Sequence, residues 1–306
     1  PDLTIILNAP DPASTPQAWL ESLLLWAGSV ARSSARIHIL SVTALDPTGE
    51  APPLSHAVRA ILQSLMLENP GVTATVLAVK APTLDAVLEE LRQTPMTQAC
   101  PLMRRLDGVR QGLFISPSLK PPTAALRGIR SRGHYVLVGG LGEVGIPLAK
   151  ALIERHHAQI SVIGRRTMSR SIAERLERIG SPDQVRYFAC DASQPEALSE
   201  TLAHITAAHP GIDGVFHLAR HVTPEPLHRL QQGEITQTLS PKVNGSEVLI
   251  QALNRYRPDW VVLFSSLAAW AGQAGGAHYA AACAYQDGLA MTHPLPILSV
   301  AWPQWI

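Results

Sequence analysis

Two hydroxyl-bearing side chains near the end of the sequence have the spacing of a proton-delivering pair. Ser266 ends an apolar segment, and Tyr279 follows it by 13 residues at the start of a predicted helix. A phenol that is hydrogen-bonded to a serine, and whose pKa is lowered by a nearby ammonium, can donate a proton to a ketone. A lysine one helical turn after the tyrosine would supply that ammonium, but Cys283 stands there.

A glycine-rich turn in the middle of the chain predicts a dinucleotide site. Gly140, Gly142 and Gly145 form a GxGxxG pattern that follows an apolar strand and opens a helix. In this context glycines let the backbone approach a pyrophosphate lying on the helix N-terminus. The alternative is a turn that merely packs helix on strand, and the carboxylate of Glu143 within the turn opposes an anion there.

The charge at the end of the next predicted strand indicates which dinucleotide would bind. Arg165 and Arg166 lie 25 and 26 residues after Gly140, with no acidic residue between the strand and the pair. An acid at this place grips the ribose hydroxyls of NAD, whereas arginine neutralises the additional phosphate of NADP. The pair therefore favours NADPH, the alternative being two solvated charges at a strand end.

The second half of the chain alternates strands and helices in the way that would bring these residues together. We expect strands at 135–138, 160–163, 184–188, 215–218, 260–264 and 297–301, and helices at 144–155, 172–179, 195–208, 235–253 and 277–291. Six strands with right-handed helical crossovers predict a doubly wound parallel sheet.

The first half repeats this rhythm without a phosphate-binding turn. Strands are expected at 3–8, 37–42 and 72–79, helices at 16–32, 57–67 and 84–91, and a short strand at 112–115. No glycine-rich turn follows the first strand, so this half is expected to be structural. The predicted fold is α/β, with two Rossmann-like doubly wound parallel-sheet subdomains: a structural one at 1–116, a Pro-rich and Arg-rich linker at 117–133, and a cofactor-binding one at 134–306.

Composition excludes several other classes of protein. The 306 residues include 25 basic and 24 acidic side chains, a net charge of +1, which leaves no broad footprint for nucleic acid. No apolar run is long enough for a membrane span. Three scattered cysteines fit a reducing, cytoplasmic location. A first residue that is Pro rather than Met, with no signal segment, suggests a piece of a longer protein.

Metal and thiol chemistry are both disfavoured. His217 and His221 have helical ligand spacing, but they lie at a predicted strand end without a nearby Cys or Glu ligand set, so no metal site is expected. Cys283 would need an activating base to act as a nucleophile, and His278, five residues earlier, would point elsewhere on the helix.

Several spaced motifs together resemble the ketoreductase domain of modular polyketide synthases, a branch of the short-chain dehydrogenase/reductases. They are the glycine turn from Gly139 to Gly145, the strand end His217-Leu-Ala219, Ser240-Pro-Lys242-Val-Asn-Gly245, Leu263-Phe-Ser-Ser266, and Tyr279-Ala-Ala-Ala-Cys283-Ala. The resemblance covers essentially the whole chain, since the first half is similar to the structural subdomain of that family.

The resemblance implies a role for each matching residue. The lysine of this family comes from an earlier helix, where Lys242 stands, and would orient Tyr279 and favour its ionised form. Tyr279 would protonate a ketone oxygen that Ser266 holds, while NADPH delivers hydride to the carbon. Asp191 matches an acid that contacts adenine, and Gly139 and Ala219 match residues lining the cofactor.

The implied function is reduction of a β-ketoacyl thioester, carried on the phosphopantetheine of an acyl carrier protein among neighbouring synthase domains. Departures from the family pattern keep a second hypothesis open, an inactive ketoreductase-like scaffold. They are Val138 for threonine, Glu143 for a small residue, Arg220 for glycine, Cys283 for asparagine and Pro303 for glycine. The signals for the hand of the product are absent: residues 222–224 hold no aspartate, and Ala271 stands where one hand has tryptophan.

Overall fold

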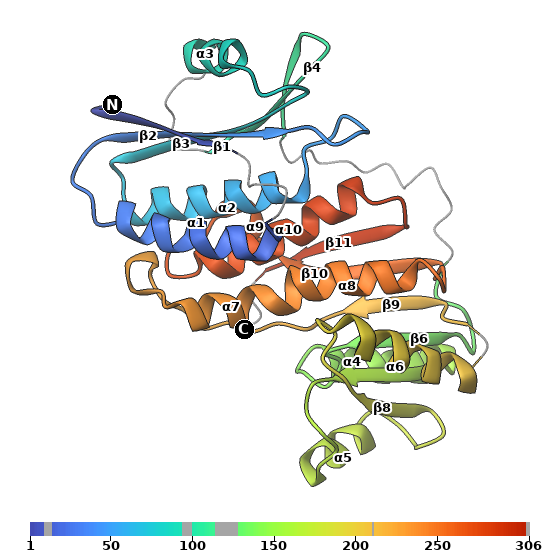
Figure 1. Cartoon of the computed structure of the whole chain (residues 1–306). Coiled ribbons are helices and arrows are strands. Elements are labelled where there is room, and N and C mark those ends of the chain that lie inside the picture. The colour runs from blue at the N-terminus through green and yellow to red at the C-terminus, as the bar shows by residue number, and fades with distance from the viewer. Residues whose placement is uncertain (9–13, 94–99, 114–127, 210, 304–306) are drawn as a thin grey trace.

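A computed structural model describes residues 1–8, 14–93, 100–113, 128–209 and 211–303. These residues form two sheets with helices between and around them (Figure 1). The predicted linker lies mostly outside the described residues, so the boundaries 1–116, 117–133 and 134–306 stay a prediction. No helix in the described part of the chain combines the length and apolar character that a membrane crossing requires.

The first sheet has five strands whose neighbours follow chain order: β1 (Leu3–Asn8), β2 (Ile37–Ala44), β3 (Val72–Val79), β4 (Leu102–Leu106) and β5 (Val109–Gly112). All pairs are parallel except β4 and β5, which form a hairpin. Its two turn residues, Asp107 and Gly108, both have positive φ, as a tight turn between twisted strands requires. The strand β4 was not predicted, and β5 begins three residues before the predicted strand at 112–115, whose last two residues lie outside the described residues.

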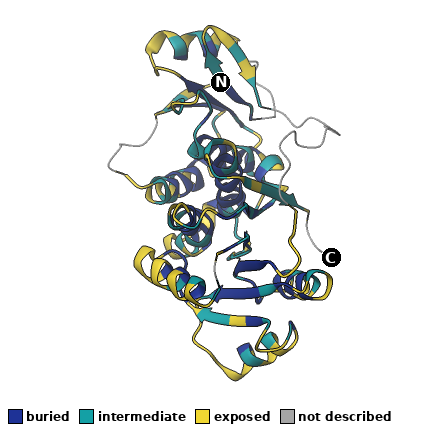
Figure 2. Ribbon diagram, turned by 90° about the vertical axis from the view of Figure 1, so that its right-hand side faces the viewer, coloured by how far each residue is buried: buried dark blue, intermediate teal, exposed yellow. Residues whose placement is uncertain are grey.

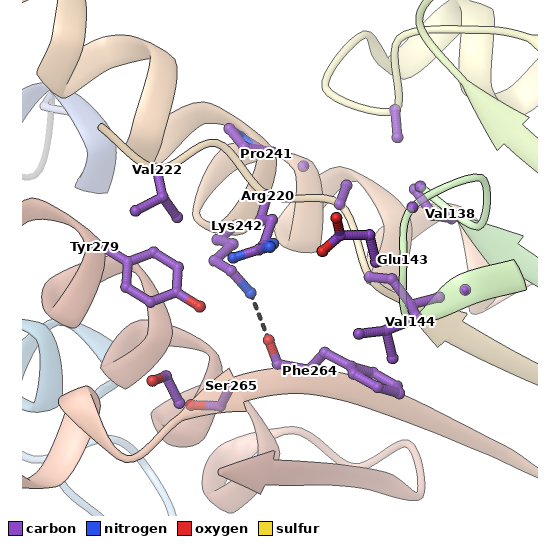
Figure 3. A pocket seen from close by; sticks show the side chains of 18 of the residues that line it. Val138, Glu143, Val144, Arg220, Val222, Pro241, Lys242, Phe264, Ser265 and Tyr279 are labelled. Carbon is purple, nitrogen blue, oxygen red and sulfur yellow. Dashed lines mark hydrogen bonds between the residues drawn. The ribbon is translucent and has the colours of Figure 1, made fainter. Parts of the chain in front are cut away.

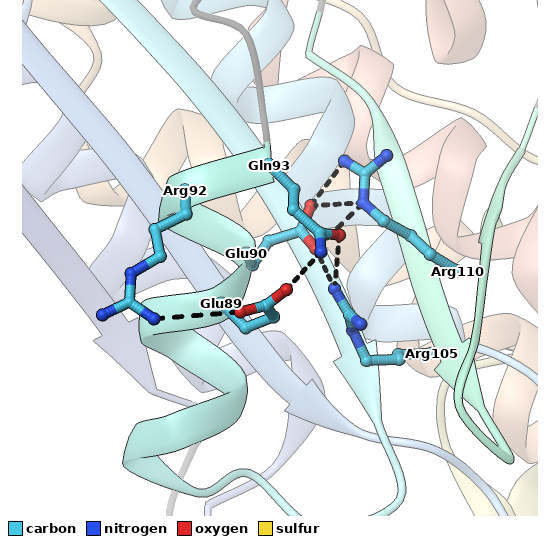
Figure 4. A network of polar contacts seen from close by, with 6 residues as sticks. All are labelled: Glu89, Glu90, Arg92, Gln93, Arg105 and Arg110. Carbon is cyan, nitrogen blue, oxygen red and sulfur yellow. Dashed lines mark hydrogen bonds and ion pairs between the residues drawn. The ribbon is translucent and has the colours of Figure 1, made fainter.

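Three helices accompany this sheet: α1 (Pro16–Val30), α2 (Pro53–Glu68) and α3 (Leu84–Gln93). Figure 1 shows α1 and α2 on the face toward the second half and α3 on the opposite face. Glu90 of α3 is fully buried and accepts hydrogen bonds from Arg110 at 2.7 Å, with Arg105 3.6 Å away (Figure 4). This buried carboxylate ties α3 to the β4–β5 hairpin, because an unpaired charge there would be costly.

The second sheet has the six predicted strands, all parallel: β6 (His134–Val138), β7 (Gln159–Gly164), β8 (Val185–Ala189), β9 (Gly214–His217), β10 (Trp260–Ser266) and β11 (Ile297–Trp302). Their order is β11-β10-β9-β6-β7-β8. The chain first winds outward from β6 to β8 and then returns to place β9 on the other side of β6. That reversal opens a crevice at the carboxyl ends of β6 and β9, where such sheets bind ligands.

Helices surround this sheet: α4 (Gly145–His156), α5 (Arg170–Glu177), α6 (Pro195–Ala208), the 3-10 turn η1 (Leu227–Arg229), α7 (Gln232–Lys242), α8 (Asn244–Leu253), α9 (Ala268–Ala271) and α10 (Ala277–Thr292). The single helix expected at 235–253 is divided into α7 and α8. Pro241 has no amide proton for the preceding turn, and the backbone leaves regular helix at Val243, where ψ is −76°.

The two halves share one hydrophobic core. Leu62 and Leu65 of α2 belong to the same buried cluster as Ala281 and Ala282 of α10, and the buried helices lie at the centre of the molecule in Figure 2. Gly288 lets the two helices approach, since a Cβ there would lie 2.5 Å from the Pro53 Cα. The α/β architecture predicted from the sequence is confirmed, and the first half packs directly against the helix that carries Tyr279.

The predicted connector also contacts the second sheet. Arg130 forms ion pairs with Asp213, at 2.7 Å, and with Asp259. Asp213 directly precedes β9, and Asp259 directly precedes β10. One arginine of the predicted Arg-rich linker is therefore paired with the amino ends of two neighbouring strands.

Candidate active site

Lys242 is buried in the centre of the candidate site. Its side chain is 1% exposed, and its ammonium donates a hydrogen bond to the Phe264 carbonyl oxygen at 2.5 Å (Figure 3). It also donates to Gln286 Oε1 at 2.9 Å. The Nζ atom lies 6.0 Å from the centroid of the Tyr279 ring. Burial lowers the pKa of this ammonium, while Cys283 and Asp287 oppose that change. The break after α7 thus turns the lysine inward and not toward bulk solvent.

Tyr279 stands in the first turn of α10, half-buried, with its hydroxyl toward the cleft (Figure 3). Burial is the main cause of a raised pKa for this phenol, and Cys283 adds to the rise. Arg220 and a hydrogen bond from Ser266 act in the opposite direction. The phenol therefore keeps its proton at ordinary pH, as a proton donor must. The family resemblance implied the opposite tendency, an ionised form favoured by Lys242.

Ser266 ends β10 beside this tyrosine. Its hydroxyl oxygen accepts a hydrogen bond from the Ala268 amide at 3.2 Å and also pairs with the Tyr279 side chain. The first contact is that of a residue capping α9, and the second joins the serine to the phenol. Ser266 therefore contacts both the start of α9 and the phenol of Tyr279.

Cys283 is fully buried one helical turn after Tyr279. Burial raises the pKa of its thiol, so the reactive thiolate is disfavoured. His278 directs its ring toward the Thr223 carbonyl oxygen, at 3.0 Å. As predicted, the nearest histidine in the sequence does not activate this thiol.

The glycines of the turn differ in what a Cβ atom would meet at each position. Gly139 has φ +80°, and a Cβ there would lie 2.7 Å from the Ala219 Cα. A Cβ on Gly145 would lie 2.3 Å from the Gly140 oxygen, so this glycine allows the helix to pack on the turn. A Cβ on Gly142 would meet nothing closer than the Gly139 oxygen, at 3.8 Å. The fold does not need glycine at 142, but a backbone that must approach a ligand does.

Residues for the rest of a dinucleotide line the same crevice. Arg165 and Arg166 are exposed after β7, and Asp191 follows β8 in a turn where its Oδ1 accepts from the Ser193 amide and hydroxyl at 3.0 and 2.8 Å. Arg175 of α5, which the sequence analysis missed, donates to the Leu141 carbonyl oxygen at 2.8 Å. This arginine fixes the glycine turn from the side of the neighbouring helix.

All these groups border one cleft of about 1400 Å³. Every predicted site residue lines it except Gly140, which lies beneath the turn against Leu137. Glu143 and Arg220 also line it with exposed side chains, and the Arg220 guanidinium lies on the side of Lys242 and Tyr279, whose pKa values its positive charge lowers (Figure 3). Its volume exceeds the usual range of about 300–1,000 Å³ for a small-molecule site, so it can hold a dinucleotide and a substrate together.

Helix α2 in the first half of the chain contacts the segment 267–276, part of which lines this cleft. Arg59 of α2 donates to the Trp270 carbonyl oxygen at 3.0 Å, and the Ser64 hydroxyl accepts from the Gln273 amide at 3.0 Å. Glu68 accepts from the Gly275 amide at 2.9 Å and from the Leu227 amide at 2.8 Å. No pattern in the sequence predicted these contacts, which join residues 159 to 211 positions apart.

The residues present fit a nicotinamide dinucleotide. Gly142 offers an open cradle before the N-terminus of α4, the place where a pyrophosphate binds. Arg165 and Arg166 follow β7 and Asp191 follows β8, and all three line the same cleft. For a metal ion the described residues offer no group of three or more histidine, cysteine, aspartate or glutamate side chains.

Strand order, switch point and glycine turn define a dinucleotide-binding protein of the Rossmann type. The family model described as KR domain matches residues 133–306, and the chain therefore belongs to the family of ketoreductase (KR) domains, which are nicotinamide-dependent reductases.

Curated relatives are similar to this chain over short parts of their own length. Polyketide synthase ThaG of Burkholderia thailandensis is 33% identical over 60% of this chain, and polyketide synthase PksM of Bacillus subtilis is 29% identical over 58%. The spectinabilin polyketide synthase system protein NorA' of Streptomyces orinoci is 28% identical over 94% of this chain. The chain spans 3%, 4% and 8% of these three relatives, respectively.

Solved structures agree with the fold. A ketoreductase domain from the bacillaene assembly line matches 99% of this chain and 81% of its own, with a TM-score of 0.82 and 22% identity. A-type ketoreductases from a modular polyketide synthase match 94% of this chain and 64% of their own, with a TM-score of 0.76 and 26% identity. At 22% identity the first likeness concerns the fold alone.

Proposed function

We propose that this chain reduces a β-ketoacyl thioester, carried on an acyl carrier protein, to the β-hydroxyacyl thioester with NADPH. The observation that carries the proposal is the juxtaposition of buried Lys242, half-buried Tyr279 and Ser266 in the cleft that also contains Gly142. The phenol of Tyr279 has Ser266 as its hydrogen-bond partner and the Lys242 ammonium nearby, and the cleft has room for both the dinucleotide and the thioester. The neighbouring synthase domains and a cytoplasmic location are part of the same proposal.

Each of the three side chains has a separate task. Bound NADPH supplies the hydride that reaches the ketone carbon. Tyr279 gives its phenolic proton to the ketone oxygen as that oxygen gains negative charge, and is left as a phenolate. Ser266 donates a hydrogen bond to the same oxygen and so fixes it beside the phenol. Lys242, held within the site, stabilises the negative charge that then remains on the phenolate.

The proposal assigns the remainder of the crevice to the cofactor. The amides of the turn at Gly139, Gly142 and Gly145 would hold the pyrophosphate, and Arg165 and Arg166 the ribose phosphate. Asp191 would contact the adenine, and Ala219, packed against Gly139, would form the floor of the site between β6 and β9.

A matched pair of measurements tests this function. NADPH fluorescence titration should show saturable binding, and a diketide thioester should be reduced with consumption of NADPH. Tyr279→Phe removes the proton but keeps the ring, so turnover should fall by about 100-fold or more, the usual contribution of a general acid, with NADPH binding nearly unchanged. Equal turnover of variant and parent would contradict the role of Tyr279.

A second function, that of a non-catalytic scaffold within a synthase, is favoured by three residues. Glu143 brings a negative charge to the turn, Arg220 borders the cleft, and Cys283 lacks an amide. A scaffold would show no saturable NADPH binding, and the titration above therefore decides between the two functions.

A further inference from the structure

Lys242 depends on two neutral acceptors to stay charged inside the protein. An ammonium is strongly hydrated in water and has three N–H donors, so its burial is tolerated only where acceptors replace water. The Phe264 carbonyl oxygen of β10 is one, and Gln286 Oε1 of α10 is the other. The two acceptors belong to different elements, and together they fix the position of the ammonium from two walls of the cleft.

Cys283 cannot supply such an acceptor. The ketoreductases that this chain resembles have asparagine there, whereas this thiol is a weak donor and a weaker acceptor than an amide. Gln286 is three residues later on α10, and positions three apart lie on one face of a helix. Helical side chains point back toward the N-terminus, so the longer glutamine brings its amide to the level of position 283.

The orientation of the Gln286 amide is determined by its neighbours. Both Gln286 and Ser246 are fully buried, and Gln286 Nε2 donates to the Ser246 hydroxyl at 2.8 Å. The opposite orientation would direct the NH₂ group at the Lys242 ammonium, where two donors would face each other. The oxygen must therefore face the lysine. Ser246 lies four residues after Lys242, so α8 supports the same amide that the lysine uses.

We propose that Gln286 is the positioning residue for Lys242 and that its amide replaces the one absent at position 283. This inference rests on the proposed ketoreductase function. The glutamine is neutral, so it accepts a hydrogen bond without cancelling the positive charge that Tyr279 needs when it becomes a phenolate. A buried Gln that bonds only to a lysine and a serine would otherwise have no reason to occupy an apolar helix face.

Two variants separate the amide from the packing of the side chain. Gln286→Leu keeps most of the volume and removes the acceptor, so kcat should fall about 10- to 100-fold, as for the loss of a hydrogen bond to a charged group, with KM nearly unchanged. Cys283→Asn in the same chain should restore most of that loss. Gln251→Leu, the same exchange at an exposed position of α8, is the control and should change neither constant.

Titration of Lys242 gives a readout that does not depend on turnover. The chain has four lysines (Lys80, Lys120, Lys150 and Lys242), so the labelled side-chain signals can be assigned with Lys242→Arg. Loss of the acceptor disfavours the ammonium, and Gln286→Leu should lower the pH at which Lys242 loses its proton. Gln286→Glu, which has nearly the same shape, should raise it. The other groups that act on this lysine, Cys283, Asp287 and Arg220, are unchanged in both variants.

The outcomes distinguish this inference from the function beneath it. If the parent protein does not reduce the thioester, the proposed function fails, and the lysine titration still decides on Gln286. Unchanged Lys242 titration in both the Leu and Glu variants would overturn the positioning role. A Cys283→Asn/Gln286→Leu double variant no faster than Gln286→Leu would overturn the claim that one amide replaces the other.

Discussion

Two glycines of one turn should respond in opposite ways to the same methyl group. A Cβ on Gly142 would meet no atom closer than 3.8 Å, whereas a Cβ on Gly145 would lie 2.3 Å from the Gly140 oxygen and 2.6 Å from its carbonyl carbon. Ordinary contacts of a Cβ begin near 3.4 Å. Gly142→Ala should therefore fold as the parent does, and Gly145→Ala should force the helix and turn apart.

The expected sizes follow from these distances. The overlap at position 145 is more than 1 Å against the Gly140 oxygen, and overpacking of this kind costs about 1–3 kcal/mol or more. The unfolding entropy of about 2.1 cal/mol/K per residue converts about 3 kcal/mol into a fall of about 5 °C in Tm for a chain of 306 residues. Gly142→Ala should leave the free energy of unfolding within about 0.5 kcal/mol of the parent.

The affinity for NADPH should instead be sensitive to Gly142→Ala, the variant whose fold is unchanged. A methyl group at 142 would keep a pyrophosphate from the turn and weaken a charge-assisted hydrogen bond, so the Kd for NADPH should rise about 10- to 100-fold. Thermal unfolding by circular dichroism and NADPH fluorescence titration measure the two quantities. The reasoning is refuted if Gly142→Ala binds NADPH like the parent, or if Gly145→Ala melts at the parent temperature.

Three further predictions concern the remainder of the site. Replacing both Arg165 and Arg166 by Ala should raise the Kd for NADPH about tenfold or more while leaving that for NADH nearly unchanged; equal losses for both cofactors would mean that these arginines do not read the phosphate. Glu68→Ala removes the acceptor of the Gly275 and Leu227 amides and should raise the KM for the thioester with the Kd for NADPH unchanged; an unaltered KM would contradict the support of the segment 267–276 by α2. The pKa of His217 is lowered to about 3 by burial and by Lys242. Because the unfolded chain binds this proton near pH 6.5, His217 makes stability fall as the pH drops from about 6.5 toward 3, by up to about 1.4 kcal/mol per unit, and His217→Leu should show a shallower fall in urea unfolding at pH 7 and pH 5. A slope identical to that of the parent would show that His217 is not buried as a neutral ring.

Some features of the site follow from short stretches of sequence. The glycine turn is visible because three glycines, an apolar strand and a helix are consecutive, and each acts on its immediate neighbours. The six strands of the second sheet were found for the same reason, since burial of both faces leaves continuous apolar runs. Lys242 was located only through its resemblance to a family motif, because a single lysine on a helix has no local signal.

Other features are decided by contacts between distant residues. The strand β4 was missed because its Arg104 and Arg105 give it no apolar alternation, and its place is set by pairing with β3. The helix expected through Val243 was divided because Pro241 breaks the ladder at a point where the lysine can turn inward. The pKa of Tyr279 could not be predicted, since its direction depends on how far α10 is buried beneath α2 and on the place of Arg220.

The sequence by itself determined the two windings, the turn that a dinucleotide would approach, and the identity of the hydroxyl groups able to deliver a proton. Only the tertiary structure decided that Gln286 faces Lys242 and that α2 holds the loop beside Tyr279. The physical reason is that strand and turn patterns arise from neighbours in the chain, whereas the environment of a buried charge is made by whichever elements pack around it. The sequence shows that residue 242 is a lysine, but the acceptors of its ammonium, Phe264 and Gln286, lie 22 and 44 residues away.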